Sequence, residues 1–168
     1  RQPEFTQIDC EMAFVTREDI LQTFEGLTQH LFQTLLNIEL GEFPRMSYDD
    51  AMIRYGSDKP DVRFGMEFVE FNDLAKGHGF QVFDDAELIV GICVPGQAET
   101  YSNKMLNDLT DWVKRPQIGA KGLVNIKVQS DGTIKSSISK YYTDEQLKSW
   151  GEKAGAGPND MLLILSGE

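Results

Sequence analysis

The chain has 168 residues, of which 40% are apolar and 26% charged, a composition typical of an ordinary soluble protein. Its formal net charge of −11 argues against general affinity for nucleic acid, which depends on clustered lysine and arginine. No apolar run is long enough to span a membrane. Two cysteines are too few for a disulfide framework or a thiolate metal site, so we expect a reducing compartment, the cytoplasm.

Residues 1–11 are predicted to form a strand, and they carry Arg1, Phe5 and Asp9 at a strict spacing of four. In an extended chain these side chains fall on one face, about 13 Å apart at about 3.3 Å per residue. The spacing suits an elongated ligand, because an Arg fork binds phosphate, Phe stacks on a flat ring and Asp holds an ammonium group. A polar edge strand with one buried Phe is the alternative, and spacing alone does not decide between the two.

Two capped helices and a loop are predicted next. A capping box that begins at Thr16 precedes apolar residues at three- and four-residue steps, which predicts an amphipathic helix up to about Asn37. A second capping box at Ser47 predicts a short helix that Gly56 closes. Residues 56–63, GSDKPDVR, are rich in turn formers and charge and are predicted to be an ordered loop.

The rest of the chain predicts an α+β sandwich, in which helices cover a sheet. A short helix is expected at 66–75, stopped by Gly77 and Gly79. The other expected elements are strands at 80–83, 87–94, 123–128 and 161–165 and helices at 102–114 and 143–153.

Three motifs together resemble one enzyme family. The pattern Arg1-x-x-x-Phe5-x-x-x-Asp9 resembles the second half of motif 2 of class II aminoacyl-tRNA synthetases. The full sequence of this segment, RQPEFTQID, resembles that of the bacterial-type aspartyl enzymes. The run RYGSDKPDVR at 54–63 is similar to a second signature of the same enzymes. VPG at 94–96, GAKGL at 119–123 and IKV at 126–128 resemble their insertion (GAD) domain.

The resemblance implies a role for each matching residue. Arg1 would contact the distal phosphates of ATP, Gln2 would also contact ATP, and Phe5 would stack on adenine. Asp9 would hold the α-ammonium group of aspartate. The roles of Glu11 and of the GSDKPD loop stay open, because a charged structural connector explains that loop equally well. No catalytic or metal-ligating residue is assigned.

The same resemblance implies an activity and its partners. Such enzymes activate aspartate with ATP to aspartyl-adenylate and transfer the aspartyl group to tRNA. Arginines and Mg²⁺ meet the charge that develops at the α-phosphorus. The implied partners are therefore aspartate, ATP and an aspartate-accepting tRNA, in a cytoplasmic enzyme that forms a homodimer through a region outside these residues.

The motifs present imply an internal fragment of such an enzyme. We expect a partial class II antiparallel catalytic domain at 1–66 and an α/β-sandwich insertion domain at 67–168 that stops before its last helix. The first strand of motif 2, motifs 1 and 3 and the anticodon-binding domain have no counterpart here. We therefore expect the 168 residues alone not to aminoacylate tRNA. The alternative is a stand-alone module for binding tRNA or protein, but such a module has no need of RQPEFTQID.

Overall fold

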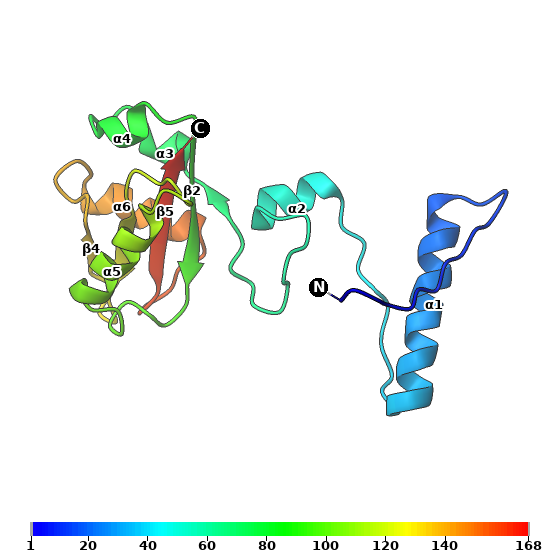
Figure 1. Ribbon diagram of the computed structural model, residues 1–168. Helices are drawn as coiled ribbons and strands as arrows, with labels where there is room; N and C mark the ends of the chain where they lie inside the picture. The colour runs from blue at the N-terminus through cyan, green and yellow to red at the C-terminus, as the bar shows by residue number, and fades with distance from the viewer. Residues whose placement is uncertain (1, 168) are drawn as a thin grey trace. The chain divides into compact units, whose positions relative to one another are not determined.

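A computed structural model describes residues 2–167. The chain divides into two compact units, Arg1–Met46 and Ser47–Glu168 (Figure 1). The first unit consists of one long helix and the irregular segments on either side of it. The second unit consists of a short helix, a loop and a five-stranded sheet with its covering helices.

The first unit is organised by helix α1, Arg17–Leu36. Its capping box forms as predicted, since Asp19 N–H donates to Thr16 Oγ1 and Thr16 N–H donates to Asp19 Oδ2 at 2.7 Å. The helix ends at Asn37, which takes the left-handed conformation at φ 53°. None of the helix residues is buried, so the caps define this helix more than packing does.

The second unit begins with helix α2, Tyr48–Tyr55. Ser47 caps it by accepting a hydrogen bond from Asp50 N–H at 3.1 Å, and Gly56 closes it at φ 66°, both as predicted. Gly56 is also required by packing, because a Cβ there would lie 2.6 Å from the ring of Phe68. The predicted loop then follows Gly56.

The sheet is antiparallel throughout, in the order β1-β2-β5-β3-β4. Its two longest strands, β2 and β5, lie side by side inside the sheet, with Ile89 opposite Ser166 and Val94 opposite Met161. The edge strands β1 and β4 have two and three residues. The strand bounds are β1 Val69–Glu70, β2 Leu88–Val94, β3 Val124–Val128, β4 Ile134–Ser136 and β5 Met161–Gly167.

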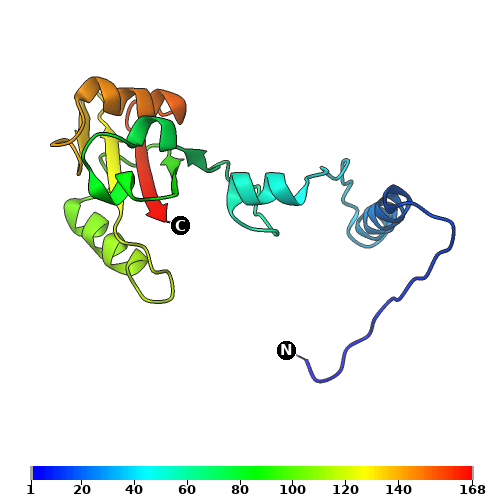
Figure 2. The same cartoon turned by 90° about the horizontal axis from the view of Figure 1, so that it is seen from above.

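Helices cover both faces of this sheet, as the predicted α+β sandwich requires. Helix α6, Asp144–Lys153, lies on one face and α5, Asn103–Val113, on the other (Figure 2). The α6 face carries the core, where Trp150 stacks on Phe71 at 5.3 Å between ring centroids and meets Tyr142 edge to face at 5.2 Å. Phe71 and Trp150 are fully buried, and Tyr142 is almost fully buried. Burial of these aromatic side chains therefore holds α6 to the sheet.

Two predictions in this unit are wrong, and one strand is missed. Residues 80–83 do not form a strand but begin the single-turn helix α4, Gln81–Asp84. The rings of Phe80 and Phe83 lie 4.8 Å apart, which helical i, i+3 spacing permits and strand alternation would not. The helix expected at 66–75 is shortened to α3, Asn72–Ala75, because β1 precedes it. Strand β4 was not predicted at all.

The edge of the sheet beyond β1 is completed by a side chain. Phe71 N–H donates to Ile89 O at 2.8 Å, and the chain then turns into α3. From there the carboxamide of Asn72 replaces the strand backbone as hydrogen-bond partner. Its Oδ1 accepts from Ile89 N–H and its Nδ2 donates to Glu87 O, both at 2.6 Å. These bonds satisfy strand groups that would otherwise lack a protein partner.

Candidate functional site

The predicted ATP- and aspartate-binding residues lie in the irregular segment before α1. Arg1 is outside the described residues. Gln2, Phe5 and Asp9 are exposed, Phe5 to 73%. The strand predicted for 1–11 is not formed by residues 2–11, because they pair with no strand in the described part of the chain. None of the three side chains makes a hydrogen bond or ion pair within residues 2–167, so the structure does not gather them into a closed site.

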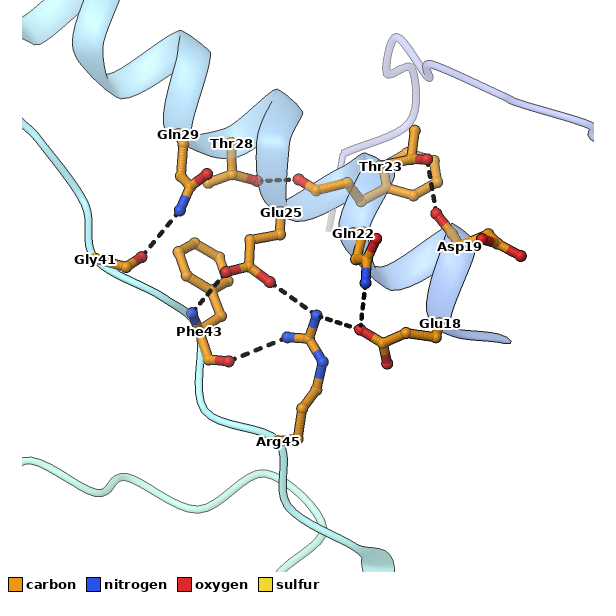
Figure 3. A network of polar contacts seen from close by, with 11 residues as sticks. Glu18, Asp19, Gln22, Thr23, Glu25, Thr28, Gln29, Gly41, Phe43 and Arg45 are labelled. Carbon is orange, nitrogen blue, oxygen red and sulfur yellow. Dashed lines mark hydrogen bonds and ion pairs between the residues drawn. The ribbon is translucent and has the colours of Figure 1, made fainter. Parts of the chain in front are cut away.

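The segment that returns along α1 is held by a polar network (Figure 3). The Glu25 carboxylate accepts from Phe43 N–H at 2.7 Å and from the Arg45 guanidinium at 2.8 Å. Arg45 also reaches Glu18 at 3.2 Å, and Gln29 Nε2 donates to Gly41 O at 3.0 Å. These bonds join residues 41–45 to α1 along about three turns of the helix.

Electrostatics in this network favour its charged state. The Phe43 N–H bond, followed by the Arg45 bond, lowers the pKa of Glu25 below its usual value. Arg45 lies between two carboxylates, and its pKa is raised by Glu25 first and Glu18 second. Each charged group is therefore matched by an opposite partner. We interpret the network as a support for the returning segment, because its three charged groups already bind one another.

The GSDKPD loop is closed at its base by a clamp. Arg54 forms a two-pronged ion pair with Glu67, Nε to Oε2 at 2.8 Å and an Nη to Oε1 at 2.6 Å. The Tyr55 hydroxyl donates to the same carboxylate at 3.2 Å. Phe68 N–H donates to Arg54 O at 2.7 Å, so backbone and side chains fasten the two ends of the loop together. The bond from Arg54 lowers the pKa of Glu67, which stays ionised near neutral pH.

The loop itself carries exposed charge. Lys59 pairs with Asp58 at 2.9 Å, and Arg63 pairs with Asp61. The basic side chains of Lys59 and Arg63 are both 84% exposed, and such surface pairs contribute little to stability. The loop therefore presents ionised groups to solvent from a fastened base, which is compatible with contact to a charged ligand and equally with a structural connector.

Sequence reasoning missed Glu67 as the partner of Arg54. The two residues are 13 positions apart, and the predicted helix at 66–75 gave Glu67 no reason to face Arg54. Charges of opposite sign on the two sides of a turn-rich loop were the available signal. That signal was ambiguous, because several acidic residues follow Arg54.

Residues 2–167 contain no group of three or more His, Cys, Asp or Glu side chains that could hold a metal ion. None of the helices in this range is long and apolar enough to cross a membrane.

Comparison with known protein families identifies the family to which this chain is similar. Residues 1–150 match the family model described as tRNA synthetases class II (D, K and N). This match covers all of the first compact unit and most of the second, and it includes both the RQPEFTQID and the RYGSDKPDVR motifs.

Curated relatives match along the whole chain. The aspartate–tRNA ligase of Bacteroides thetaiotaomicron is 60% identical over 169 aligned residues, which is 100% of this chain and 29% of the relative. The aspartate–tRNA ligase of Porphyromonas gingivalis is 59% identical with the same coverage. That of Flavobacterium psychrophilum is 58% identical over 99% of this chain and 28% of the relative. The chain thus spans less than a third of the length of these relatives.

Proposed function

Because the chain belongs to the class II tRNA synthetases (D, K and N), we propose that it forms part of an aspartate–tRNA ligase. The observation that carries this proposal is the match of relatives with that name along the whole chain, at up to 60% identity. The two motifs RQPEFTQID and RYGSDKPDVR support it, since they occur here in the order that the family resemblance implies.

The proposed reaction has two steps. In the first, a carboxylate oxygen of aspartate attacks the α-phosphorus of ATP, a new P–O bond forms, and pyrophosphate leaves. In the second, a terminal ribose hydroxyl of tRNA attacks the carbonyl carbon of aspartyl-adenylate, the ester forms, and AMP leaves. Both steps need the reacting groups held in line, so the contribution expected from this chain is mainly positioning.

Within this reaction the N-terminal segment would position two substrates. Arg1 would bind the distal phosphates of ATP, Gln2 would contact ATP, and Phe5 would stack on adenine. Asp9 would hold the ammonium group of aspartate. All three described side chains, Gln2, Phe5 and Asp9, are exposed and unpaired within residues 2–167, so they are free to contact ligands. Mg²⁺ would act with ATP in the whole enzyme, and this chain offers no group of three metal-ligating side chains among its described residues.

The proposal extends to the organisation of the whole enzyme. Residues 1–66 would belong to the catalytic domain and residues 67–168 to an insertion domain. The complete enzyme would be a cytoplasmic homodimer whose subunits meet outside these residues, and its third substrate would be an aspartate-accepting tRNA. The 168 residues alone would not catalyse either step, because the proposed ATP site needs arginines that they do not supply.

A second candidate is an interaction module based on the sheet. One observation favours it, namely that the sheet and its helices bury a core of their own, with Trp150, Phe71 and Leu162 fully buried. Such a module would bind tRNA or protein without chemistry. It leaves the motif RQPEFTQID without a purpose, which is why the ligase is the first candidate.

The deciding experiment is aspartate-dependent ATP–pyrophosphate exchange on the full-length ligase that contains this chain. Phe5→Ala should raise the KM for ATP by about 5- to 150-fold, the equivalent of a stacking contact of about 1–3 kcal/mol. Asp9→Ala should raise the KM for aspartate by on the order of 100-fold, because the ammonium group loses its charged partner.

Matched controls are available on the exposed side of α5. Trp112→Ala removes an exposed aromatic side chain and Asp108→Ala an exposed carboxylate, and both should leave exchange unchanged. Unchanged exchange in Phe5→Ala and Asp9→Ala would refute the assigned roles and favour the interaction module. Exchange activity in residues 1–168 alone would refute the proposed dependence on the rest of the enzyme.

A further inference from the structure

A polar pocket lies between α5 and the outer strands β3 and β4, on the sheet face opposite the aromatic core. Its volume is about 580 Å³, within the range of small-molecule sites. Among the described residues that line it, the apolar ones are Ala98 and Leu106. The side chains that define this lysine–amide pocket are Asn103, Asn107, Asn125, Lys127, Gln129 and Lys135.

The two lysines of the pocket lie next to each other, an arrangement that is unfavourable for like charges. Lys127 and Lys135 are direct partners in the β3–β4 register, so both side chains leave the sheet on the same face. Lys127 is half-buried and donates from Nζ to Tyr101 O, whereas Lys135 is exposed. Within residues 2–167 neither ammonium group lies within 4.0 Å of a carboxylate oxygen.

The nearby acidic groups do not cancel this charge. Glu99 lines the pocket, and its carboxylate accepts a hydrogen bond from Ser130 Oγ at 2.6 Å. Asp131 is bound by Thr133 N–H at 2.9 Å, and its pKa is lowered mainly by the bonds from Thr133 and least by the charge of Lys135. Two ammonium groups thus face one lining carboxylate. In a chain with a net charge of −11, this is a local positive site that fits an anion.

The asparagine side chains of the pocket indicate which other groups the ligand carries. Asn103 and Asn107 lie one turn apart on α5, and Asn125 faces them from β3. Each carboxamide both donates and accepts hydrogen bonds, and this suits a ligand with several hydroxyl groups. Ser136 and Ser137 line the β4 side of the pocket and hold Asn125 in place, since Ser136 Oγ donates to Asn125 O at 2.8 Å and Ser137 Oγ accepts from Asn125 N–H at 3.3 Å. An anionic group next to hydroxyl groups is the chemistry of a sugar phosphate.

We propose that the lysine–amide pocket binds the ribose–phosphate part of a nucleotide, with the phosphate at Lys127 and Lys135 and the ribose hydroxyls at the asparagines. The 2′-hydroxyl would let the pocket prefer RNA to DNA. The choice of RNA as the source of this group rests on the proposed function, in which tRNA is a substrate. A free sugar phosphate carries the same chemistry and is the other source to be tested.

The test uses the 168-residue chain with two probes, a fluorescein-labelled uridine tetranucleotide followed by anisotropy and ribose 5-phosphate followed by amide chemical shifts. Lys135→Gln should weaken tetranucleotide binding about fivefold. It should also lower the slope of log affinity against log salt by about 0.7, the loss of one phosphate contact in a single strand. A purely structural lysine would leave this slope unchanged. The deoxyuridine tetranucleotide should bind more weakly than its RNA counterpart.

Lys148→Gln is the matched control, because Lys148 is exposed on α6, which covers the other face of the sheet. Its affinity and salt slope should equal those of the unmodified chain. Shifts at the pocket with ribose 5-phosphate but not with RNA would identify a free sugar phosphate as the ligand. No response to either probe, or equal losses in Lys135→Gln and Lys148→Gln, would overturn the proposal. Aspartate and ATP are absent from the assay, so its failure is separate from failure of the proposed function.

Discussion

Helices α1 and α6 begin in the same way and are stabilised differently. Each starts at a threonine that forms a capping box, Thr16 for α1 and Thr143 for α6. Helix α6 buries Leu147 and Trp150 completely, whereas α1 has twice the length and no buried residue. Capping and local propensity are therefore enough to define where a helix lies. Burial decides how much the helix contributes to the free energy of unfolding.

The largest expected effect tests this contrast at one aromatic residue in each helix. Trp150→Ala should lower the free energy of unfolding by about 3–5 kcal/mol, because it empties the centre of the core. Phe24→Ala on α1 should cost clearly less, about 1 kcal/mol, since Phe24 keeps 37% of its surface exposed and α1 has no buried residue. Denaturant unfolding followed by far-ultraviolet circular dichroism measures both. Equal losses in the two variants would contradict the comparison.

A smaller effect is expected from adding one methyl group to each region. Gly91 lies in β2, and a Cβ there would be 2.7 Å from Leu163 O and from Ile164 Cγ1. Gly91→Ala should therefore destabilise the sheet by about 1–3 kcal/mol. Gly26 in α1 has open space around it, so Gly26→Ala should stabilise that helix by about 0.5–1 kcal/mol. Thermal melting of both variants gives the two signs, and a destabilising Gly26→Ala would show that α1 packs more tightly than described.

The smallest effect is a pH dependence of the free energy of unfolding that arises in the core of the second unit. Burial, followed by the charge of Asp84, raises the pKa of Tyr142 from 10.0 to about 12. The unfolded chain loses this proton first, so the stability contributed by Tyr142 is fully present below pH 10 and falls as the pH rises toward 12. Urea unfolding at pH 8, 10 and 11 should show the decline. Tyr142→Phe should flatten it, while losing the hydrogen bond to Ala75 O at a cost of about 1 kcal/mol. An unchanged slope in Tyr142→Phe would assign the decline to another group.

The parts of the fold that sequence predicted well depend on neighbours in the chain. Thr16, Ser47 and Thr143 cap helices through residues three positions away, and the apolar run of β5 lies within seven residues. The missed elements depend on distant partners. The strand β4 exists because it pairs with β3 through only three residues, a contact that no local pattern in Ile134–Ser136 announces.

The candidate site follows the same rule. Gln2, Phe5 and Asp9 were found from a motif that is continuous in sequence. Their proposed contacts depend on ligands and on groups outside residues 2–167, and this is why the three side chains are exposed and unpaired within that range. Arg54 and Glu67 show the opposite case, because their ion pair joins the ends of a loop and could be found only in three dimensions.

The carboxamide of Asn72 has a consequence for association between molecules. A sheet grows by adding a strand to an edge that still offers free backbone groups. Here Asn72 already occupies Ile89 N–H and Glu87 O, and the edge strand β1 offers only two residues. An incoming strand would find no long row of partners at this side. Replacing Asn72 by a residue without a carboxamide would free Ile89 N–H and Glu87 O, and we expect the first sign to be aggregation rather than a change of fold.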